Sequence, residues 1–310
     1  MKNPIVIRSL LLATIVLTFP NLVGAQQVAD TSYHPPIPKP EYESGSGPVV
    51  FIDEGHHNFH TKDGRYKAFA SLLERDGYVV KGYTGPFTKQ ELEKGSIMVV
   101  SNALNAINVE DWYLPNPSAF TESEIETVRQ WVADGGSLFL IADHMPMAGA
   151  AADLASAFGF EFSNGFVVDT LANGPAYFNL KEKTLHESIL TKGRGPEERV
   201  EQIATFTGQA FKIPHNAREV LTFNDNYVNL LPDTAWVFDK HTRKFNVKGW
   251  SQGAYASYGK GKVVAFGEAA MFTAQLAGPQ KRKAGMNSDV APENYKLLLN
   301  IIHWLDGKLD

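Results

Sequence analysis

No cysteine occurs in this sequence of 310 residues. The absence excludes disulfide bonds, thiolate metal ligands and a cysteine nucleophile, so a hydrophobic core has to stabilise the fold without covalent help. Basic blocks and stripes are also missing and the formal net charge is −5, so we do not expect a nucleic-acid partner. The hydrophobic fraction of 44% is typical of a globular protein.

Glycine-rich nucleotide-binding motifs are absent too. The chain has no G-x-x-x-x-G-K-[ST] loop and no G-x-G-x-x-G segment after its first predicted strand. Gly259-Lys260-Gly261 precedes a predicted strand instead of a helix, and we interpret it as a hairpin turn. The sequence therefore contains no motif that indicates a nucleotide cofactor.

Long apolar runs are confined to the start of the chain. Lys2 and Arg8 accompany the apolar run Leu10–Phe19, and Val23-Gly24-Ala25 is a small-residue cleavage site. This pattern predicts a secretory signal peptide over residues 1–25, because an apolar run of about ten residues is too short to span a membrane. We therefore expect a periplasmic or secreted protein without a transmembrane segment after cleavage.

The next stretch, residues 26–47, contains Pro35-Pro36-Ile37-Pro38-Lys39-Pro40 and then Ser44-Gly45-Ser46-Gly47. A composition rich in Pro, Ser and Gly predicts an extended, polyproline-like tether. We expect residues 48–310 to form a single α/β domain.

Strands and helices alternate through about residue 160. The predicted strands are Val49–Asp53, Tyr78–Val80, Ile97–Val100 and Ser137–Ala142. Helices are predicted at Arg65–Asp76, from Thr121 with Glu124 in a capping box, and at Gly149–Phe158. Continuous apolar strands that alternate with helices indicate a mostly parallel central sheet covered on both faces.

The rest of the chain is harder to assign. Phe160–Thr170 resembles a strand pair or hairpin, residues 173–208 resemble long loops, and Glu219–Phe223 and Thr234–Phe238 resemble strands. Gln252–Ser257 and Lys262–Phe266 predict a hairpin that returns to the sheet. An apolar stripe predicts a closing helix over Pro292–Leu305.

Polar side chains follow four predicted strands at the point where each strand ends. In a parallel sheet these ends meet at one edge, where ligands bind. We therefore predict a site there. The candidate catalytic residues are Asp53, Glu54, His56, Asp143, His144 and Glu268, and the candidate substrate-binding residues are His57, Asn58, His60 and Asn102.

These residue types allow three interpretations. Histidines and carboxylates bind divalent ions, although no H-E-x-x-H motif is present, so a metal cofactor stays open. The same groups serve as general acid and base without metal, and we favour His144 or Glu54 as base, with Asp143 orienting it. Alternatively, Asp and Asn after a strand only cap helices or close turns.

Aromatic residues also stand in predicted loops. Trp112, Tyr113, Tyr177 and Phe178 are the clearest examples. They could line a cleft that binds sugar, or they could simply pack against the body of the domain.

Two segments carry a resemblance to a known superfamily. Trp131–His144 reads WVADGGSLFLIADH, a helix end, a Gly-Gly stop, a strand and a polar elbow, and Phe266–Phe272 reads FGEAAMF before the final helix. With the polar elbow after the first strand, they resemble the class I glutamine amidotransferase-like superfamily, and more narrowly secreted bacterial domains related to ThuA-like proteins. The resemblance covers residues 48–170 and 250–306.

This resemblance implies a flavodoxin-like three-layer sandwich with a functional elbow after a central strand. In true amidotransferases the elbow carries a cysteine, whereas here it carries Asp143-His144. ThuA-like relatives imply a link to sugar metabolism. We expect either a hydrolase-type enzyme acting on a carbohydrate or another polar small substrate, or a non-catalytic domain that binds a carbohydrate or a partner.

Overall fold

The computed structural model describes residues 27–310. The predicted signal peptide lies outside these described residues, so it remains a prediction. Within residues 27–310, no helix has both the length and the apolar character needed to cross a membrane.

Five adjacent parallel strands form one half of the central sheet. In spatial order they are β3 (Val79–Tyr83), β2 (Val49–Asp53), β4 (Ile97–Ser101), β5 (Ser137–Ile141) and β15 (Gly261–Phe266). Numbered along the chain, this is the order 2-1-3-4-5 of flavodoxin-like folds, in which the strand order reverses between the first and third strands. The ends of β2 and β4 therefore flank the position where such folds bind ligands.

The other half of the sheet is antiparallel, so the sheet is more mixed than the sequence predicted. β14 (Ser251–Tyr258) forms the expected hairpin with β15, and β10 (Phe211–Lys212), β6 (Glu161–Phe162) and β11 (Arg218–Thr222) extend it. The predicted strand Glu219–Phe223 is thus confirmed as β11.

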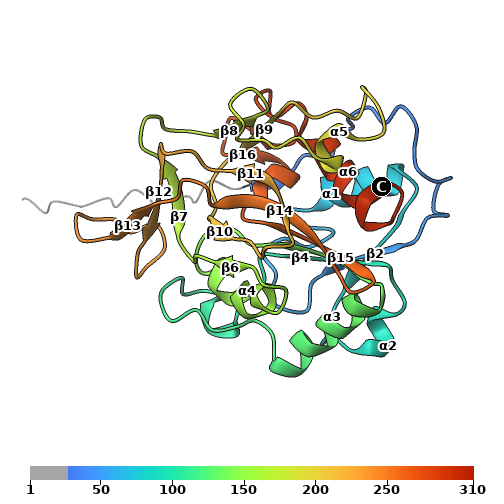
Figure 1. Cartoon of the computed structure of the whole chain (residues 1–310), viewed down its shortest axis with the longest axis horizontal. Helices are drawn as coiled ribbons and strands as arrows, with labels where there is room; N and C mark the ends of the chain where they lie inside the picture. Colours follow the sequence, from blue (N-terminus) through green and yellow to red (C-terminus); the bar gives the residue numbers. More distant parts are fainter. Residues whose placement is uncertain (1–26) are drawn as a thin grey trace, which may run out of the picture.

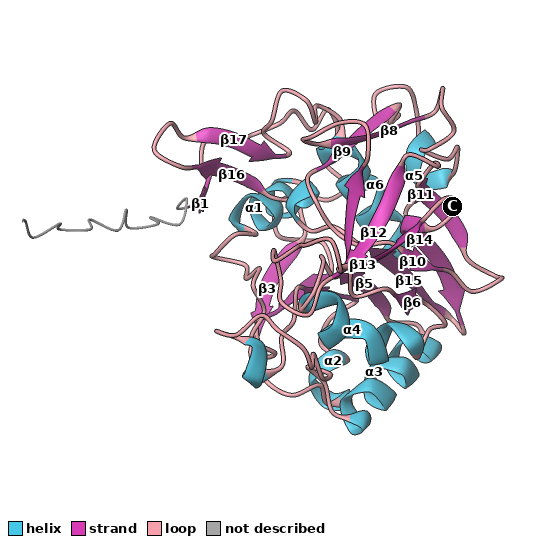
Figure 2. Ribbon diagram, turned by 90° about the vertical axis from the view of Figure 1, so that its left-hand side faces the viewer, coloured by secondary structure: helices cyan, strands magenta, loops and turns pink. Residues whose placement is uncertain are grey.

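Helices cover both faces of the sheet and make a three-layer α/β sandwich. α1 (Lys67–Arg75) and α6 (Asn294–Leu305) lie on one face, and α2 (Lys89–Leu92), α3 (Glu122–Asp134) and α4 (Met147–Ser156) lie on the other (Figures 1 and 2). The residues of β4 and β5 are buried throughout, because their side chains enter a separate apolar core on each face.

The predicted capping box of α3 is confirmed. Thr121 Oγ1 accepts a hydrogen bond from the Glu124 N–H, and the Glu124 carboxylate accepts one from the Thr121 N–H. Gly135 follows the helix at φ 127, a left-handed value that a residue with a side chain would adopt at a cost.

The middle of the chain builds two further small sheets. β7 (Phe166–Asp169), β12 (Tyr227–Leu231) and β13 (Arg243–Asn246) form one that projects on the left in Figure 1. The second pairs β8 (Ala176–Asn179) with β9 (Gln202–Thr205), and the short helix α5 (Ile189–Lys192) lies between them in sequence.

Two predictions in this region are wrong. Residues 160–170 do contain two strands, but β6 and β7 join different sheets instead of pairing with each other. Thr234–Phe238 is not a strand, because Trp236 adopts a left-handed φ of 66 and turns the chain. Only Thr234 pairs with another segment, in an isolated bridge to Tyr113.

The segment predicted to be a tether is instead attached to the domain over much of its length. β1 (Gln27–Ala29) pairs with β16 (Ala274–Ala277), which also pairs with β17 (Arg282–Gly285). Farther along, the Glu41 N–H donates to buried Asp76. Specific hydrogen bonds that its composition does not reveal therefore hold the segment against the domain.

Candidate functional site

The loop after β2 forms a closed polar network. His56 Nδ1 lies 2.9 Å from both carboxylate oxygens of Asp53, and its Nε2 lies 3.1 Å from Glu124 Oε1 on α3. Asn58 donates to Asp53 Oδ2 at 2.9 Å and accepts from the His56 N–H. Phe87 and Phe120 pack on the His56 ring and keep water away from it.

This arrangement makes His56 a bridging cation. Burial by itself lowers the pKa of His56, but hydrogen bonds and the charges of Asp53 and Glu124 raise it above the ordinary value. Burial likewise raises the pKa of Glu124, yet hydrogen bonds from Thr121, His56 and Phe87 lower it to about 2. Both ring nitrogens of His56 are therefore occupied, and this network has a structural role.

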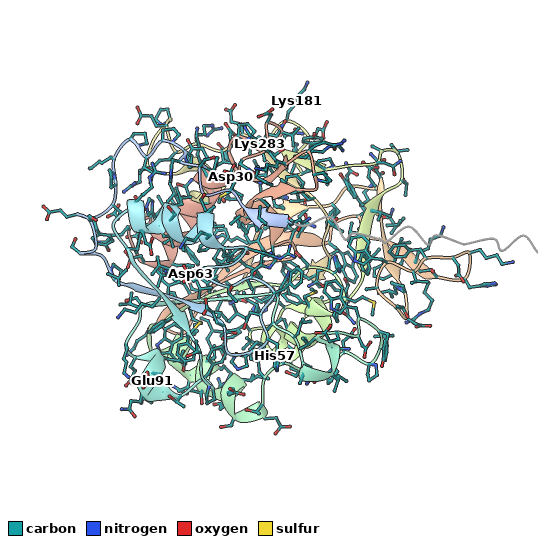
Figure 3. The ribbon with its side chains drawn as sticks, turned by 180° about the vertical axis from the view of Figure 1, so that it is seen from behind. Asp30, His57, Asp63, Glu91, Lys181 and Lys283 are labelled. Carbon is teal, nitrogen blue, oxygen red and sulfur yellow. The ribbon has the colours of Figure 1, made fainter. Side chains whose placement is uncertain are left out.

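Two other predicted residues of the same loop point away from it. Glu54 Oε1 accepts a hydrogen bond from the Lys62 N–H at 2.7 Å. His57, labelled in Figure 3, is exposed and has a left-handed φ of 49. Neither residue is placed to share chemistry with the buried network.

A second cluster joins the ends of β4 and β5. Asn102 Nδ2 donates to Asp143 Oδ2 at 2.8 Å, and the Asp143 N–H donates back to Asn102 Oδ1 at 2.8 Å. Asn102 has a left-handed φ of 48, which asparagine tolerates better than most residues do. The two strand ends that the sequence predicted to converge are thus tied directly together.

Glu268 follows β15 and completes this cluster. Its two carboxylate oxygens accept from the backbone N–H groups of Ala270 and Met271, at the start of the 3₁₀ turn Ala270–Phe272. The backbone N–H of Ala269, the residue between Glu268 and Ala270, donates to Asp143 Oδ1. One short turn therefore holds two carboxyl groups close together.

Burial strongly affects both carboxyl groups. It raises the pKa of Asp143, against the lowering effect of His144 and Asn102. It also raises the pKa of Glu268 well above its ordinary value, and the negative charge of Asp143 raises it further. Because two adjacent buried carboxylates cannot both ionise cheaply, the pair retains a proton to a higher pH than isolated carboxyls do.

His144 lies beside this pair and differs from His56 in having one nitrogen without a partner. Nδ1 lies 2.7 Å from the Met145 carbonyl oxygen. A carbonyl can only accept, so Nδ1 carries the proton and Nε2 has a free lone pair. No residue in the range 27–310 hydrogen-bonds Nε2. Burial lowers the pKa of His144 despite Asp143 nearby, so the ring is neutral near pH 7.

Aromatic side chains from the middle of the chain fix the His144 ring. Phe166 of β7 stacks on it at a centroid distance of 4.1 Å, and Trp236 meets it edge-on at 4.7 Å. Trp112 lies farther away, at 6.3 Å. Trp112 was among the aromatic residues expected in loops, whereas Phe166 and Trp236 were not expected near the site, because strand β7 and the turn at Trp236 lie in the part of the chain whose fold the sequence did not predict.

The fourth predicted binding residue, His60, is buried on the other side of the cluster. Its ring packs on Tyr66 at 4.8 Å, and its Nδ1 has no hydrogen-bond partner among the described residues. Burial and the charge of Arg65 lower the pKa of His60 to about 3, so the ring is neutral. Arg65 also lies over Phe59 and acts electrostatically on Asp143.

The metal interpretation receives no structural support. Over residues 27–310, no group of three or more His, Asp or Glu side chains is arranged to hold a metal ion. The carboxylates that could have served as ligands instead accept hydrogen bonds from backbone N–H groups, His56 or Asn side chains.

No nucleophile elbow was expected from the sequence, but Gly249-Trp250-Ser251-Gln252-Gly253 does have the G-x-S-x-G spacing of such an elbow. In the structure Ser251 opens the antiparallel strand β14, whereas an elbow requires a strand, a sharp turn and a helix. Ser251 is buried with no hydrogen-bond partner for its Oγ within the described chain, so no histidine activates it.

The raised pKa of Glu268 predicts a measurable pH dependence of stability. The folded state holds this proton more tightly than the unfolded chain, so wild-type stability falls as the pH rises above 4.5, the ordinary pKa. Glu268→Gln removes the titration. In urea unfolding at about pH 5 and about pH 8, the variant should gain stability relative to wild type at the higher pH.

Exposed Glu110 provides the control for this measurement. Glu110→Gln should follow wild type at both pH values. A stability difference between wild type and Glu268→Gln that is the same at both pH values would show that Glu268 is ionised throughout.

Comparisons with known proteins support the fold. No protein-family model matches this sequence, and no curated protein matches it either. Among solved structures it is similar to the N-terminal domain of mmIFT52, with 13% identity, coverage of 83% of this chain and 96% of that one, and a TM-score of 0.57. A cytoplasmic protein from Salmonella typhimurium has 15% identity, coverage of 83% and 98%, and a TM-score of 0.51.

Similar structures also include a ThuA-like protein from Bacteroides uniformis, with 12% identity, coverage of 85% of this chain and 94% of that one, and a TM-score of 0.45. That score is too low to carry an argument about function, and identities in this range establish a likeness of fold alone. The chain therefore shares the α/β fold of these proteins, and its chemistry has to be argued from its own side chains.

Proposed function

We propose that this protein is a hydrolase-type enzyme that acts on a carbohydrate or another polar small substrate, with His144 as general base. The observation that carries the proposal is the state of the His144 ring. Its Nδ1–H is fixed on the Met145 carbonyl and its Nε2 lone pair has no partner in the described chain. A fixed, neutral imidazole of this kind is ready to take a proton at neutral pH.

The neighbouring groups support this role. In hydrolysis, Nε2 would accept a proton from the attacking water, which would turn the ring into an imidazolium ion. The negative charge of Asp143 stabilises that ion, because it raises the pKa of His144 against the effect of burial. Asn102 and the Ala269 N–H hold Asp143 in position. Asp143 does not orient the His144 ring as the sequence suggested, because Nδ1 is bonded to the Met145 carbonyl, and it acts on the ring through its charge instead.

The proposal narrows the site that the sequence suggested. Asp53 and His56 belong to the closed network, and Glu54 is bonded to the Lys62 N–H. We therefore place them outside the chemistry. Secretion to the periplasm or the medium remains part of the proposal, on the sequence pattern alone.

The test is turnover. Purified protein is assayed against chromogenic p-nitrophenyl glycosides and p-nitrophenyl esters. For any substrate that is cleaved, His144→Ala should lower kcat/KM about 100-fold or more, the usual contribution of a general base. Activity should also persist as the pH falls somewhat below 6.5, because the pKa of His144 is lowered from that value.

His215 is exposed and serves as the matched control, so His215→Ala should retain full activity. Thermal unfolding shows whether each variant is folded. If folded His144→Ala turns over substrate at the wild-type rate, His144 is not the base.

A non-catalytic binding domain is the second candidate, and one specific observation favours it. Asp53, Asp143 and Glu268 all have their oxygens occupied by hydrogen bonds within the domain. Enzymes usually keep a catalytic carboxylate free to reach its substrate. Binding of a sugar or another small molecule without turnover on any member of the substrate panel would favour this candidate.

A further inference from the structure

A pocket lies next to the His144 cluster and shares walls with it. It has a volume of about 240 Å³, far more than a single water molecule needs. Phe166 and Trp236, which hold the His144 ring, are among its lining residues. The pocket can therefore hold a small molecule near the aromatic rings that pack on His144.

Several aromatic rings line the pocket. Phe166, Trp236 and Phe238 pack together, with centroids of Phe166 and Trp236 4.8 Å apart and of Phe166 and Phe238 5.2 Å apart. Trp236 is 55% exposed and Phe238 is 39% exposed, so these rings form a rim. Aromatic faces carry partial negative charge and attract cations.

The ionisable groups of the pocket are acidic or neutral. Asp169 lines it, and no lysine, arginine or histidine among residues 27–310 does. Tyr227 also lines it, and burial together with the charges of Asp169 and Glu182 raises its pKa to about 12, so it is a neutral hydroxyl at physiological pH. An anion would find no positive partner here, whereas a cation would find a carboxylate and several π faces.

From these observations we infer that the pocket binds a small organic ammonium ion, held by the rings of Phe166, Trp236 and Phe238 and by the Asp169 carboxylate. The inference deepens the proposed function, since it assigns a charged group to the ligand that binds near the His144 cluster, and that part rests on the proposed function. Binding itself does not depend on catalysis.

The test uses three probes of similar length and different charge: n-butylammonium, n-butanol and butyrate. Isothermal titration calorimetry on the full chain should show n-butylammonium binding at least about tenfold more tightly than n-butanol, a difference of about 1.4 kcal/mol. Butyrate should not bind. Equal binding of n-butanol or butyrate, or no binding of n-butylammonium at millimolar concentrations, overturns the inference.

Variants locate the site. Asp169→Asn and Trp236→Ala should each weaken n-butylammonium binding about fivefold or more. Two exposed residues that do not line the pocket provide matched controls. Asp233→Asn makes the same charge change as Asp169→Asn, and Val237→Ala truncates the side chain next to Trp236. These two should bind as wild type does. Unchanged binding in Asp169→Asn and Trp236→Ala would place the ligand elsewhere.

This experiment separates the two proposals. Titration needs no turnover, so binding with unaffected activity in His144→Ala would remove the catalytic role and leave the ammonium pocket intact. If His144→Ala loses turnover but n-butylammonium does not bind to wild type, the catalytic role of His144 stands and the ammonium pocket is removed.

Discussion

Replacing His56 with alanine should lower the free energy of unfolding by about 3–5 kcal/mol, the usual cost of removing one partner from a buried ion pair. His56 is 7% exposed and Asp53 is fully buried, so the substitution leaves the Asp53 carboxylate without its cationic partner. Glu124, 12% exposed, loses the same cation. Urea unfolding at about pH 6 measures the loss.

The pH dependence of this effect has a definite sign. The folded-state pKa of His56 is raised above 6.5, so its stabilising contribution is complete below that value and disappears as the pH rises through the folded-state pKa. The difference between wild type and His56→Ala should therefore shrink toward alkaline pH. Above the folded-state pKa one ring nitrogen faces a carboxylate without a proton between them.

Two further variants test the explanation. His241 is exposed, and His241→Ala should stay within about 0.5 kcal/mol of wild type. Adding Glu124→Gln to His56→Ala removes one of the stranded charges and should recover part of the loss. If His56→Ala costs less than about 1 kcal/mol at every pH, His56 is not charged in the folded protein.

Asn102 should show the second large effect, in two separable parts. Asn102→Gly keeps the left-handed backbone but removes both hydrogen bonds to Asp143, and should cost about 2–3 kcal/mol, since bonds to charged groups are worth more than neutral ones. Asn102→Ala should cost about 1–2 kcal/mol more, because its Cβ makes φ 48 unfavourable. Chemical denaturation of the two variants gives both values.

The order of the two variants is the critical result. Alanine less destabilising than glycine would mean that the backbone at this position relaxes to negative φ when the side chain is lost. Asn216, which is exposed and does not have a left-handed φ, provides a reference position at which alanine should be no worse than glycine.

Regular elements with strong local signals were predictable from sequence. The strands β2, β4, β5 and β15 are continuous apolar runs, and their ends carry the polar residues that meet at one sheet edge. The capping box of α3 was also readable, because Thr121 and Glu124 interact over three residues. Patterns of this kind depend on near neighbours and on a period set by the backbone.

The sheet formed by β7, β12 and β13 was not predictable in the same way. β7 and β12 are separated by a long stretch of chain, and β7 pairs with β12 instead of with nearby β6. Pairing between distant segments depends on three-dimensional packing that no local pattern records. Because this sheet brings in Phe166, and the turn at Trp236 packs against it, the walls of the pocket were missed with it.

Tertiary contacts gave the histidines of the predicted cluster different protonation states and different partners. By itself the sequence determined which residues gather after the strand ends, since a parallel sheet places all those ends on one edge. It could not determine that Glu124, far along the chain, would reach His56 and occupy its second nitrogen. Only the tertiary structure decided that His56 bridges two carboxylates and that the His144 ring is neutral, because a histidine's protonation follows from the groups that surround its two nitrogens in space.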